Sequence, residues 1–287
     1  MALVPSHVGA LVMPELLVGA VSSLVASVVW VASIWGYKRI MDRRPFARLF
    51  NFHRRRPILF VFPCRSDEPG AEGLIQNARI SFEDMLASNY IQRCIELAGF
   101  SPEVVEMRED RYLTPGSRDF QANLVVLCSP KSNTVTAPLL DEINRTYDID
   151  WGFKRLPSGR FAIVTGAGVC ESKTYDQAAA IKAAGQPIEQ GQLDDVAMII
   201  KCPNPFDRGS TVLIVAGVRG IGTWGAAYYL RDHATKLSER TGGEPFCLLL
   251  RIRYAALQIT HFEEVTPPML LNARRRLTPA RPAALTG

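Results

Sequence analysis

An uncharged run near the N-terminus constrains this chain more than any other feature. Residues 16–37 contain no Asp, Glu, Lys or Arg. A helix rises about 1.5 Å per residue, so such a run matches the roughly 30 Å hydrocarbon core of a bilayer. Trp30, Trp35 and Tyr37 gather towards its C-terminal end, as amphipathic rings do at the headgroup region. The run predicts a transmembrane helix, with a buried core helix of a soluble protein as the alternative.

The charges around this run predict its orientation. The basic segment, residues 38–56, carries eight Lys and Arg against Asp42, whereas residues 1–15 carry only Glu15. A secretory signal peptide has its positive charge before the apolar run, so an uncleaved anchor is expected. The positive-inside rule then places the short N-terminus, residues 1–15, outside the cytoplasm. We expect a single-pass protein of the cell membrane whose C-terminal domain is cytoplasmic.

Charge and residue size also predict partners. The arginines of the basic segment suit anionic lipid headgroups, either on a short interfacial helix or on a solvated linker. Gly19, Ser23 and Ser27 recur at every fourth position, which lets helices approach closely in lipid and predicts a homo-oligomer. The remaining body is mildly acidic, so no nucleic-acid partner is expected.

Residues 57–265 alternate apolar runs with helical patterns, which predicts one α/β domain. We expect a Rossmann-like, mainly parallel sheet with helices on both faces and right-handed crossovers. Residues 266–287 form a basic tail, expected to be loose. The expected strands are residues 58–62, 103–107, 123–128, 160–165, 196–201, 211–216 and 246–254, with 256–265 as an extension of the sheet. The expected helices are residues 74–98, 137–147 and 176–184, and one that follows the glycines after residue 216 and runs to about 240.

Residues 211–230 combine a strand, a glycine turn and a helix, an architecture that offers helix N–H groups to an anion. Gly220, Gly222 and Gly225 fit G-x-G-x-x-G, the dinucleotide pattern. That pattern also needs an acidic residue about 20 positions on, at the end of the next strand. Here Glu244 precedes that strand. The stretch resembles Rossmann-like nucleotide-binding architecture, and the alternative is a turn whose glycines let a helix pack close to a sheet.

Polar or glycine-bearing loops follow four of the expected strands. Ligands of open α/β sheets bind beyond the carboxyl ends of the strands, where these loops should converge. Their cationic, hydroxyl and N–H groups suit a phosphate or another small anionic ligand. The candidate ligand-binding residues are Arg65, Ser66, Ser129, Lys131, Asn133, Gly166, Gly168, Arg219, Gly220, Gly222 and Thr223.

Motifs for common enzyme classes do not occur in the sequence. It contains no G-x-S-x-G, no Walker G-x-x-x-x-G-K-[ST] and no H-E-x-x-H. No metal site is expected, because the six cysteines form no C-x-x-C pair and isolated cysteines of a reducing compartment behave as small apolar residues. A Cys₄ site is the alternative, since four cysteines follow expected strands. These are Cys64, Cys128, Cys170 and Cys202.

Three functions remain open. The leading expectation is a membrane-anchored sensor or effector that binds a nucleotide or other anionic small molecule, so the candidate cofactors are a nucleotide and a dinucleotide. The second is a membrane-tethered enzyme that acts on NAD(P) or a nucleotide, by oxidoreduction or by N-glycosidic cleavage at a carboxylate such as Asp67, Glu68 or Glu171. The third is a structural subunit of a membrane assembly. A carboxylate that faces the cleft favours the enzyme, whereas a cleft without one favours the sensor.

Overall fold

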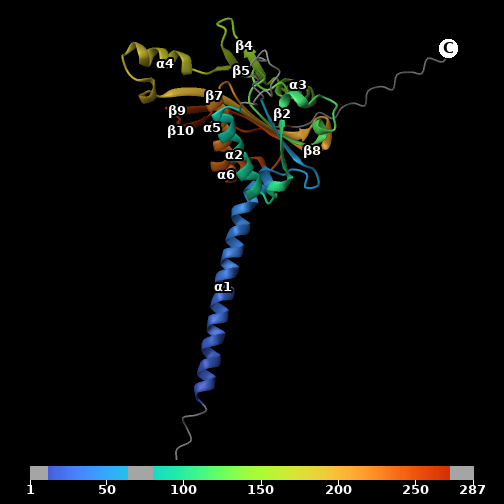
Figure 1. The fold of residues 1–287 in the computed structure, drawn as a ribbon, viewed down its shortest axis with the longest axis vertical. Helices are drawn as coiled ribbons and strands as arrows, with labels where there is room; N and C mark the ends of the chain where they lie inside the picture. Colours follow the sequence, from blue (N-terminus) through green and yellow to red (C-terminus); the bar gives the residue numbers. More distant parts are fainter. Residues whose placement is uncertain (1–11, 64–79, 272–287) are drawn as a thin grey trace, which may run out of the picture. The chain divides into compact units, whose positions relative to one another are not determined.

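The computed structural model describes residues 12–63 and 80–271 of the chain (Figure 1). It divides into two units, Met1–Arg44 and Pro45–Gly287. The first unit contains most of helix α1, and the second contains the α/β domain.

Helix α1, Val12–Leu49, is the one helix in the described ranges that is long and apolar enough to span a membrane. Its large apolar side chains between residues 21 and 41 are exposed all around the helix, Leu24, Val28 and Trp30 among them. The hydroxyls of Ser27 and Ser33 donate to carbonyl oxygens four residues earlier, at 2.8 Å, so these polar groups are satisfied within the helix. The helix does not end at the last uncharged residue but continues through the basic positions to Leu49.

The end of α1 and the residues after it belong to the core of the α/β domain. Leu49, Phe50 and Phe52 are buried, and Phe46 packs against the same cluster. Each buried aromatic or leucine side chain contributes about 1.5–3 kcal/mol relative to its exposed state. The basic segment is therefore partly built into the folded domain.

The central sheet has eight strands in the order β10-β9-β7-β8-β3-β1-β2, with β11 on β9. The strands are β1 (Ile58–Phe62), β2 (Val105–Glu109), β3 (Asn123–Leu127), β7 (Leu193–Asn204), β8 (Asp207–Gly217), β9 (Phe246–Ala255), β10 (Gln258–Glu264) and β11 (Met269–Leu270). The sheet thus extends past residue 265, where the sequence analysis ends the domain.

Most strands of this sheet point the same way. Neighbouring strands β2, β1, β3 and β8 are parallel, and β9 runs in the same direction. Strand β7 lies antiparallel between β8 and β9, because only Pro205 and Phe206 separate β7 from β8. So short a connection forms a hairpin, whereas a parallel crossover needs a dozen or more residues. The mainly parallel α/β sheet is confirmed in this coarse form, with β7, β10 and β11 reversed.

Both faces of the sheet are covered, by different elements (Figure 1). Helices α2 (Phe82–Leu97), α5 (Gly220–Asp232) and α6 (Ala234–Thr241) cover one face. Helix α3 (Thr136–Tyr147) covers the other with a second sheet of three antiparallel strands. That sheet comprises β4 (Gly152–Arg155), β5 (Phe161–Thr165) and β6 (Gly168–Glu171), and α4 (Thr174–Ala183) follows it.

The position of β5 corrects one expectation. The sequence pattern predicts residues 160–165 as a strand of the central sheet, but β5 pairs with β4 and β6. Its buried Ile163 packs against the core cluster beneath α3. An apolar run of five residues does not distinguish a central strand from a strand of a small covering sheet, because both bury the same kind of side chain.

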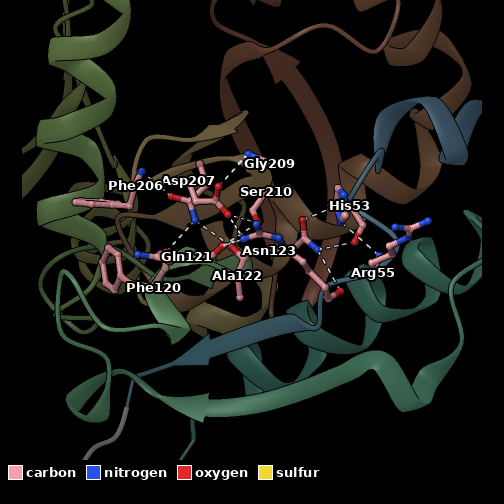
Figure 2. Close-up of polar contacts among 12 residues, drawn as sticks. His53, Arg55, Phe120, Gln121, Ala122, Asn123, Phe206, Asp207, Gly209 and Ser210 are labelled. Carbon is pink, nitrogen blue, oxygen red and sulfur yellow. Dashed lines mark hydrogen bonds and ion pairs between the residues drawn. The ribbon is translucent and has the colours of Figure 1, made fainter.

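A polar network fixes the amino ends of β1, β3 and β8 (Figure 2). The fully buried Asn123 accepts hydrogen bonds from the backbone N–H groups of His53 and Thr211, both at 3.1 Å. Its amide donates to the carbonyl oxygen of His53 at 3.0 Å. Arg56 pairs with Asp207 and donates to the carbonyl oxygen of Gln121. This network holds the segment that follows α1 against the sheet.

Candidate functional site

Two adjacent chambers lie near the carboxyl ends of β3 and β8. The first chamber has a volume of about 370 Å³ and lies between the start of α2, the β3–α3 loop and the β8–α5 turn. The second chamber has a volume of about 390 Å³ and lies between the β3–α3 loop, the β4–β5 hairpin and the start of α4. They share four lining residues, Lys131, Tyr175, Val218 and Arg219. Each volume is at the lower end of the range for small-molecule sites.

The β3–α3 loop is held rigidly at the edge of the first chamber. Cys128 ends the strand in the left-handed region, with φ of 78°, which turns the chain sharply. The buried amide of Asn133 donates to the carbonyl oxygens of Val61 and Leu127, at 3.1 and 2.8 Å. Asn133 therefore joins β1 to β3 and does not line either chamber. The loop presents Ser129 and Lys131 to the first chamber instead.

The β8–α5 turn opens the first chamber to a helix N-terminus. The hydroxyl of Thr223 accepts a hydrogen bond from the Gly217 N–H at 3.0 Å, which closes the turn. A Cβ on Gly217 would lie 2.3 Å from the Thr223 nitrogen, so only glycine fits there. Gly220 and Ile221, at the start of α5, line the chamber. The first N–H groups of a helix have no carbonyl partner within it and can bind an anion.

The other two glycines of the pattern serve packing. A Cβ on Gly222 would lie 2.4 Å from Oδ2 of Asp195 on β7, and a Cβ on Gly225 would lie 2.7 Å from Cγ2 of Ile252 on β9. These positions therefore let α5 approach the sheet closely. Gly222 does not line either chamber.

Two cations face the chambers from the two loops. The Arg219 guanidinium lies over the ring of Tyr175, 4.6 Å from its centroid, and the Lys131 ammonium lies 5.6 Å from the centroid of Phe161. Within the described residues, neither cation forms an ion pair with a carboxylate. Both charges are therefore available to an anion. Each cation–π contact stabilises the position of its side chain by about 0.5–1 kcal/mol.

Carboxylates also contribute to the first chamber, which the sequence analysis missed. Glu83 and Asp84, in the first turn of α2, line it. Asp84 is buried and accepts a hydrogen bond from the Cys128 thiol at 2.9 Å. Glu83 is less buried, and the Cβ position of Gly220 lies 3.1 Å from its Cβ. The signal in the sequence is the N-cap: Ser81 accepts a hydrogen bond from the Asp84 N–H, and a Ser with acidic residues two and three positions later marks a helix start.

A third carboxylate, Asp195, lies beneath the start of α5. It is fully buried, and its Oδ2 accepts a hydrogen bond from the Arg219 N–H at 3.1 Å. Burial raises the pKa of Asp195 to about 6, although neighbouring donors and the charge of Arg219 act in the opposite direction. The carboxyl group thus supports the turn that carries Arg219.

The predicted ligand-binding residues divide into four groups. Ser129, Lys131, Arg219, Gly220 and Thr223 come together around the first chamber. Asn133 and Gly222 lie in the supporting structure, as described above. Arg65 and Ser66 lie outside the described residues.

Gly166 and Gly168 lie away from the chambers, in the β5–β6 hairpin. They were predicted to line the site because β5 was assigned to the central sheet. The opposite end of β5 lines the second chamber, with Arg155, Gly159 and Arg160 of the β4–β5 hairpin. The direction of a strand in a separate sheet decides which of its ends faces a site, and the sequence pattern does not reveal that direction.

Metal-ligating side chains are not grouped in the described part of the chain. No three His, Cys, Asp or Glu side chains there lie together in an arrangement that would hold a metal ion. Cys128, Cys170 and Cys202 are buried. Burial raises the pKa of the Cys170 thiol, which keeps it protonated and apolar in character.

Chemically, the first chamber combines cations, hydroxyls and helix N–H groups with two carboxylates, and Glu83 lies against the start of α5. These groups can bind the phosphate of a ligand and place a carboxylate beside the part of the ligand to which the phosphate is attached. No protein-family model, curated protein or solved structure matches the chain in the comparisons made.

Proposed function

We propose that the domain binds a nucleotide or another phosphate-bearing small molecule in the first chamber and acts as a membrane-anchored sensor or effector. The observation that carries this proposal is the meeting of Arg219, Lys131 and the start of α5 around one chamber. It lies at the carboxyl ends of parallel strands, where open α/β sheets bind ligands. Both cations are unpaired with carboxylates in the described part of the chain, so a phosphate would supply their counter-charge.

The aromatic lining supports a ligand with a planar ring. Tyr175 is 54% exposed and lines both chambers. The Arg219 and Arg160 guanidinium groups lie over the Tyr175 ring, 4.6 and 6.0 Å from its centroid. A nucleobase would stack on this layer of aromatic ring and guanidinium groups, in a way that tolerates different bases. A nucleotide combines the ring with the phosphate, so it matches the lining better than a simple anion does.

Membrane anchoring through α1 completes this proposal. The span would place the N-terminus outside and the ligand-binding domain in the cytoplasm, with the basic positions of α1 near anionic lipid headgroups. Self-association through the small residues of the span would bring two or more ligand-binding domains together. A ligand that favours one arrangement of these domains would then act as a signal.

A second candidate function is N-glycosidic cleavage of NAD(P) or a nucleotide, favoured by Glu83. Its carboxylate lines the first chamber beside the start of α5. A carboxylate at this place can act as the nucleophile or general base. Of the carboxylates singled out from the sequence, Glu171 lies on β6 and lines neither chamber, and Asp67 and Glu68 lie outside the described residues.

The proposal is tested with the full chain in detergent. Native mass spectrometry would detect a co-purifying nucleotide, and calorimetry would measure the affinities of AMP, ADP and NAD⁺. Replacing Arg219 with Ala removes one charge-assisted hydrogen bond and should weaken binding by about 1.5–3 kcal/mol, or roughly 10- to 150-fold. Arg145→Ala is the matched control, because Arg145 is exposed on α3 and lines neither chamber. If no nucleotide co-purifies and none of the three probes binds, the proposal is wrong.

The enzyme alternative is tested with Glu83→Gln. This change keeps the size of the side chain and removes its charge. If the chain cleaves NAD⁺, chromatography should detect nicotinamide release by the wild type and a loss of at least about 100-fold in Glu83→Gln, the effect of removing a positioned acid–base group. Binding without any cleavage by the wild type would support the sensor.

A further inference from the structure

The second chamber differs from the first in its charge. Four cationic side chains line it, and no Asp or Glu lines it among the described residues. The cations are Lys131, Arg155, Arg160 and Arg219. The first chamber is lined by two of the same cations and by two carboxylates. The basic character of the site is therefore concentrated in the second chamber, away from Glu83.

The four cations differ in how far they are already neutralised. Arg160 makes a bidentate pair with Asp176, at 2.6 and 2.7 Å. Arg155 forms no carboxylate pair with any described residue, and it donates a long hydrogen bond of 3.4 Å to the Gly159 carbonyl oxygen. Lys131 and Arg219 are also without carboxylate partners in the described part of the chain. Three of the four charges thus remain for an anion.

The two chambers meet at a wall formed by the residues that they share. Lys131, Tyr175 and Arg219 line both chambers, so an anion placed at this wall would contact cations from either side. The aromatic rings are also divided: Phe161 lines the second chamber alone, whereas Tyr175 faces both. Each chamber thus has cations and an aromatic ring in its lining, and the two chambers meet at the residues that they share.

From this arrangement we infer that the ligand consists of two nucleoside units joined through phosphate, with one unit in each chamber and the linkage at Lys131 and Arg219. This inference rests on the proposed function and extends it to Arg155 and the β4–β5 hairpin. The second unit carries a further phosphate, which Arg155 binds. A mononucleotide fills the first chamber alone and leaves Arg155 unused.

The inference is tested by binding of AMP, NADP⁺ and the 5′-phosphorylated linear diadenylate pApA to the full chain in detergent. NADP⁺ joins its units through a pyrophosphate and pApA through a phosphodiester, and each carries one further phosphate on a unit, so their relative affinities identify the linkage. We expect at least one of the two to bind about tenfold or more tightly than AMP. Arg155→Gln should weaken that probe by about tenfold or more and leave the affinity for AMP unchanged. Arg145→Gln, the matched loss of an exposed charge, should change neither.

The variants separate this inference from the proposed function. Arg219→Ala should weaken AMP and the two-unit probe alike. If Arg155→Gln has no effect on either two-unit probe while Arg219→Ala weakens AMP, the two-chamber ligand is wrong and the proposed function stands. An equal loss for AMP in Arg155→Gln also overturns the inference, since one nucleotide would then occupy the basic chamber. If no probe binds the wild type, both proposals fail.

Discussion

At the residue scale, the glycine pattern of α5 combines two different roles. Gly220 faces the first chamber, but Gly222 has its Cβ direction blocked by Asp195 and by the carbonyl oxygen of Val196, at 2.4 and 3.0 Å. Gly222→Ala should therefore destabilise the domain by about 1–3 kcal/mol through overpacking. Urea unfolding of the chain in detergent measures this. Gly166→Ala is the control, because no atom lies within 4 Å of its added Cβ, and a value as large as that for Gly222→Ala would contradict the packing role.

Asp195 predicts a pH dependence of stability. Its pKa is raised in the folded state from 3.8 to about 6 by burial, so the folded chain binds a proton that the unfolded chain has released over this range. The stability contributed by this group is present in full below about pH 4 and is lost as the pH rises through about 6, by about 3 kcal/mol at most. Asp195→Asn cannot ionise. The unfolding free energies of this variant and of the wild type are measured from pH 4 to 7. The variant's value minus the wild type's should rise by up to about 3 kcal/mol as the pH rises. A difference that does not change with pH would refute the role of Asp195.

At the element scale, the strands and helices followed from apolar periodicity, but their partners did not. The runs at β1, β3 and β8 were expected within a residue or a few of their observed bounds, because β-branched runs between turns are a strong local signal. The reversal of β7 was readable and was missed: Asn204 and Pro205 lie between two apolar runs with no helix between them, which indicates a hairpin. The β4–β6 sheet was not readable, since pairing of short strands depends on contacts distant in sequence.

The difference between local patterns and contacts distant in sequence also explains which site residues were predicted. Lys131 and Arg219 follow strands of the central sheet, so the rule for the carboxyl ends of strands found them. Glu83 and Arg155 reach the chambers from α2 and from the small sheet. Such residues come to a site through packing of elements on a sheet, which no local pattern encodes.

Helix α1 carries the prediction that belongs to a single element. If Gly19, Ser23 and Ser27 form a contact face, Gly19→Ile combined with Ser23→Ile should lower self-association in a membrane two-hybrid assay by at least about fivefold, equivalent to about 1 kcal/mol of helix contact. Val21→Phe with Val25→Phe adds bulk on the opposite side of the helix and should leave association unchanged. Equal association in all three proteins would move any contact to the α/β domain.

At the scale of the whole molecule, the basic positions divide between two tasks. Arg56 pairs with Asp207, and Arg54 lies over the ring of Phe100, so these residues stabilise the domain. Lys38, Arg39, Arg43 and Arg44 precede the boundary of the folded unit at Pro45. A test of membrane orientation must therefore change the second group, because replacing the first would also disturb the fold.

The proposed membrane orientation rests on the positive charge that follows the apolar part of α1. A reporter fused after Gly287 should behave as cytoplasmic, because positively charged residues within about 15–20 positions of a span remain on the cytoplasmic side. Replacing Lys38, Arg39, Arg43 and Arg44 together with Gln should produce a mixture of orientations, measured by labelling a C-terminal tag from outside the cell. The control variant has Arg in place of Lys38 and Lys in place of the three arginines. It keeps the charge and should keep the orientation. If the wild-type tag is labelled from outside the cell, the topology is the opposite of the one proposed. Both chambers would then lie in the extracytoplasmic space, and the proposed nucleotide would have to be found there.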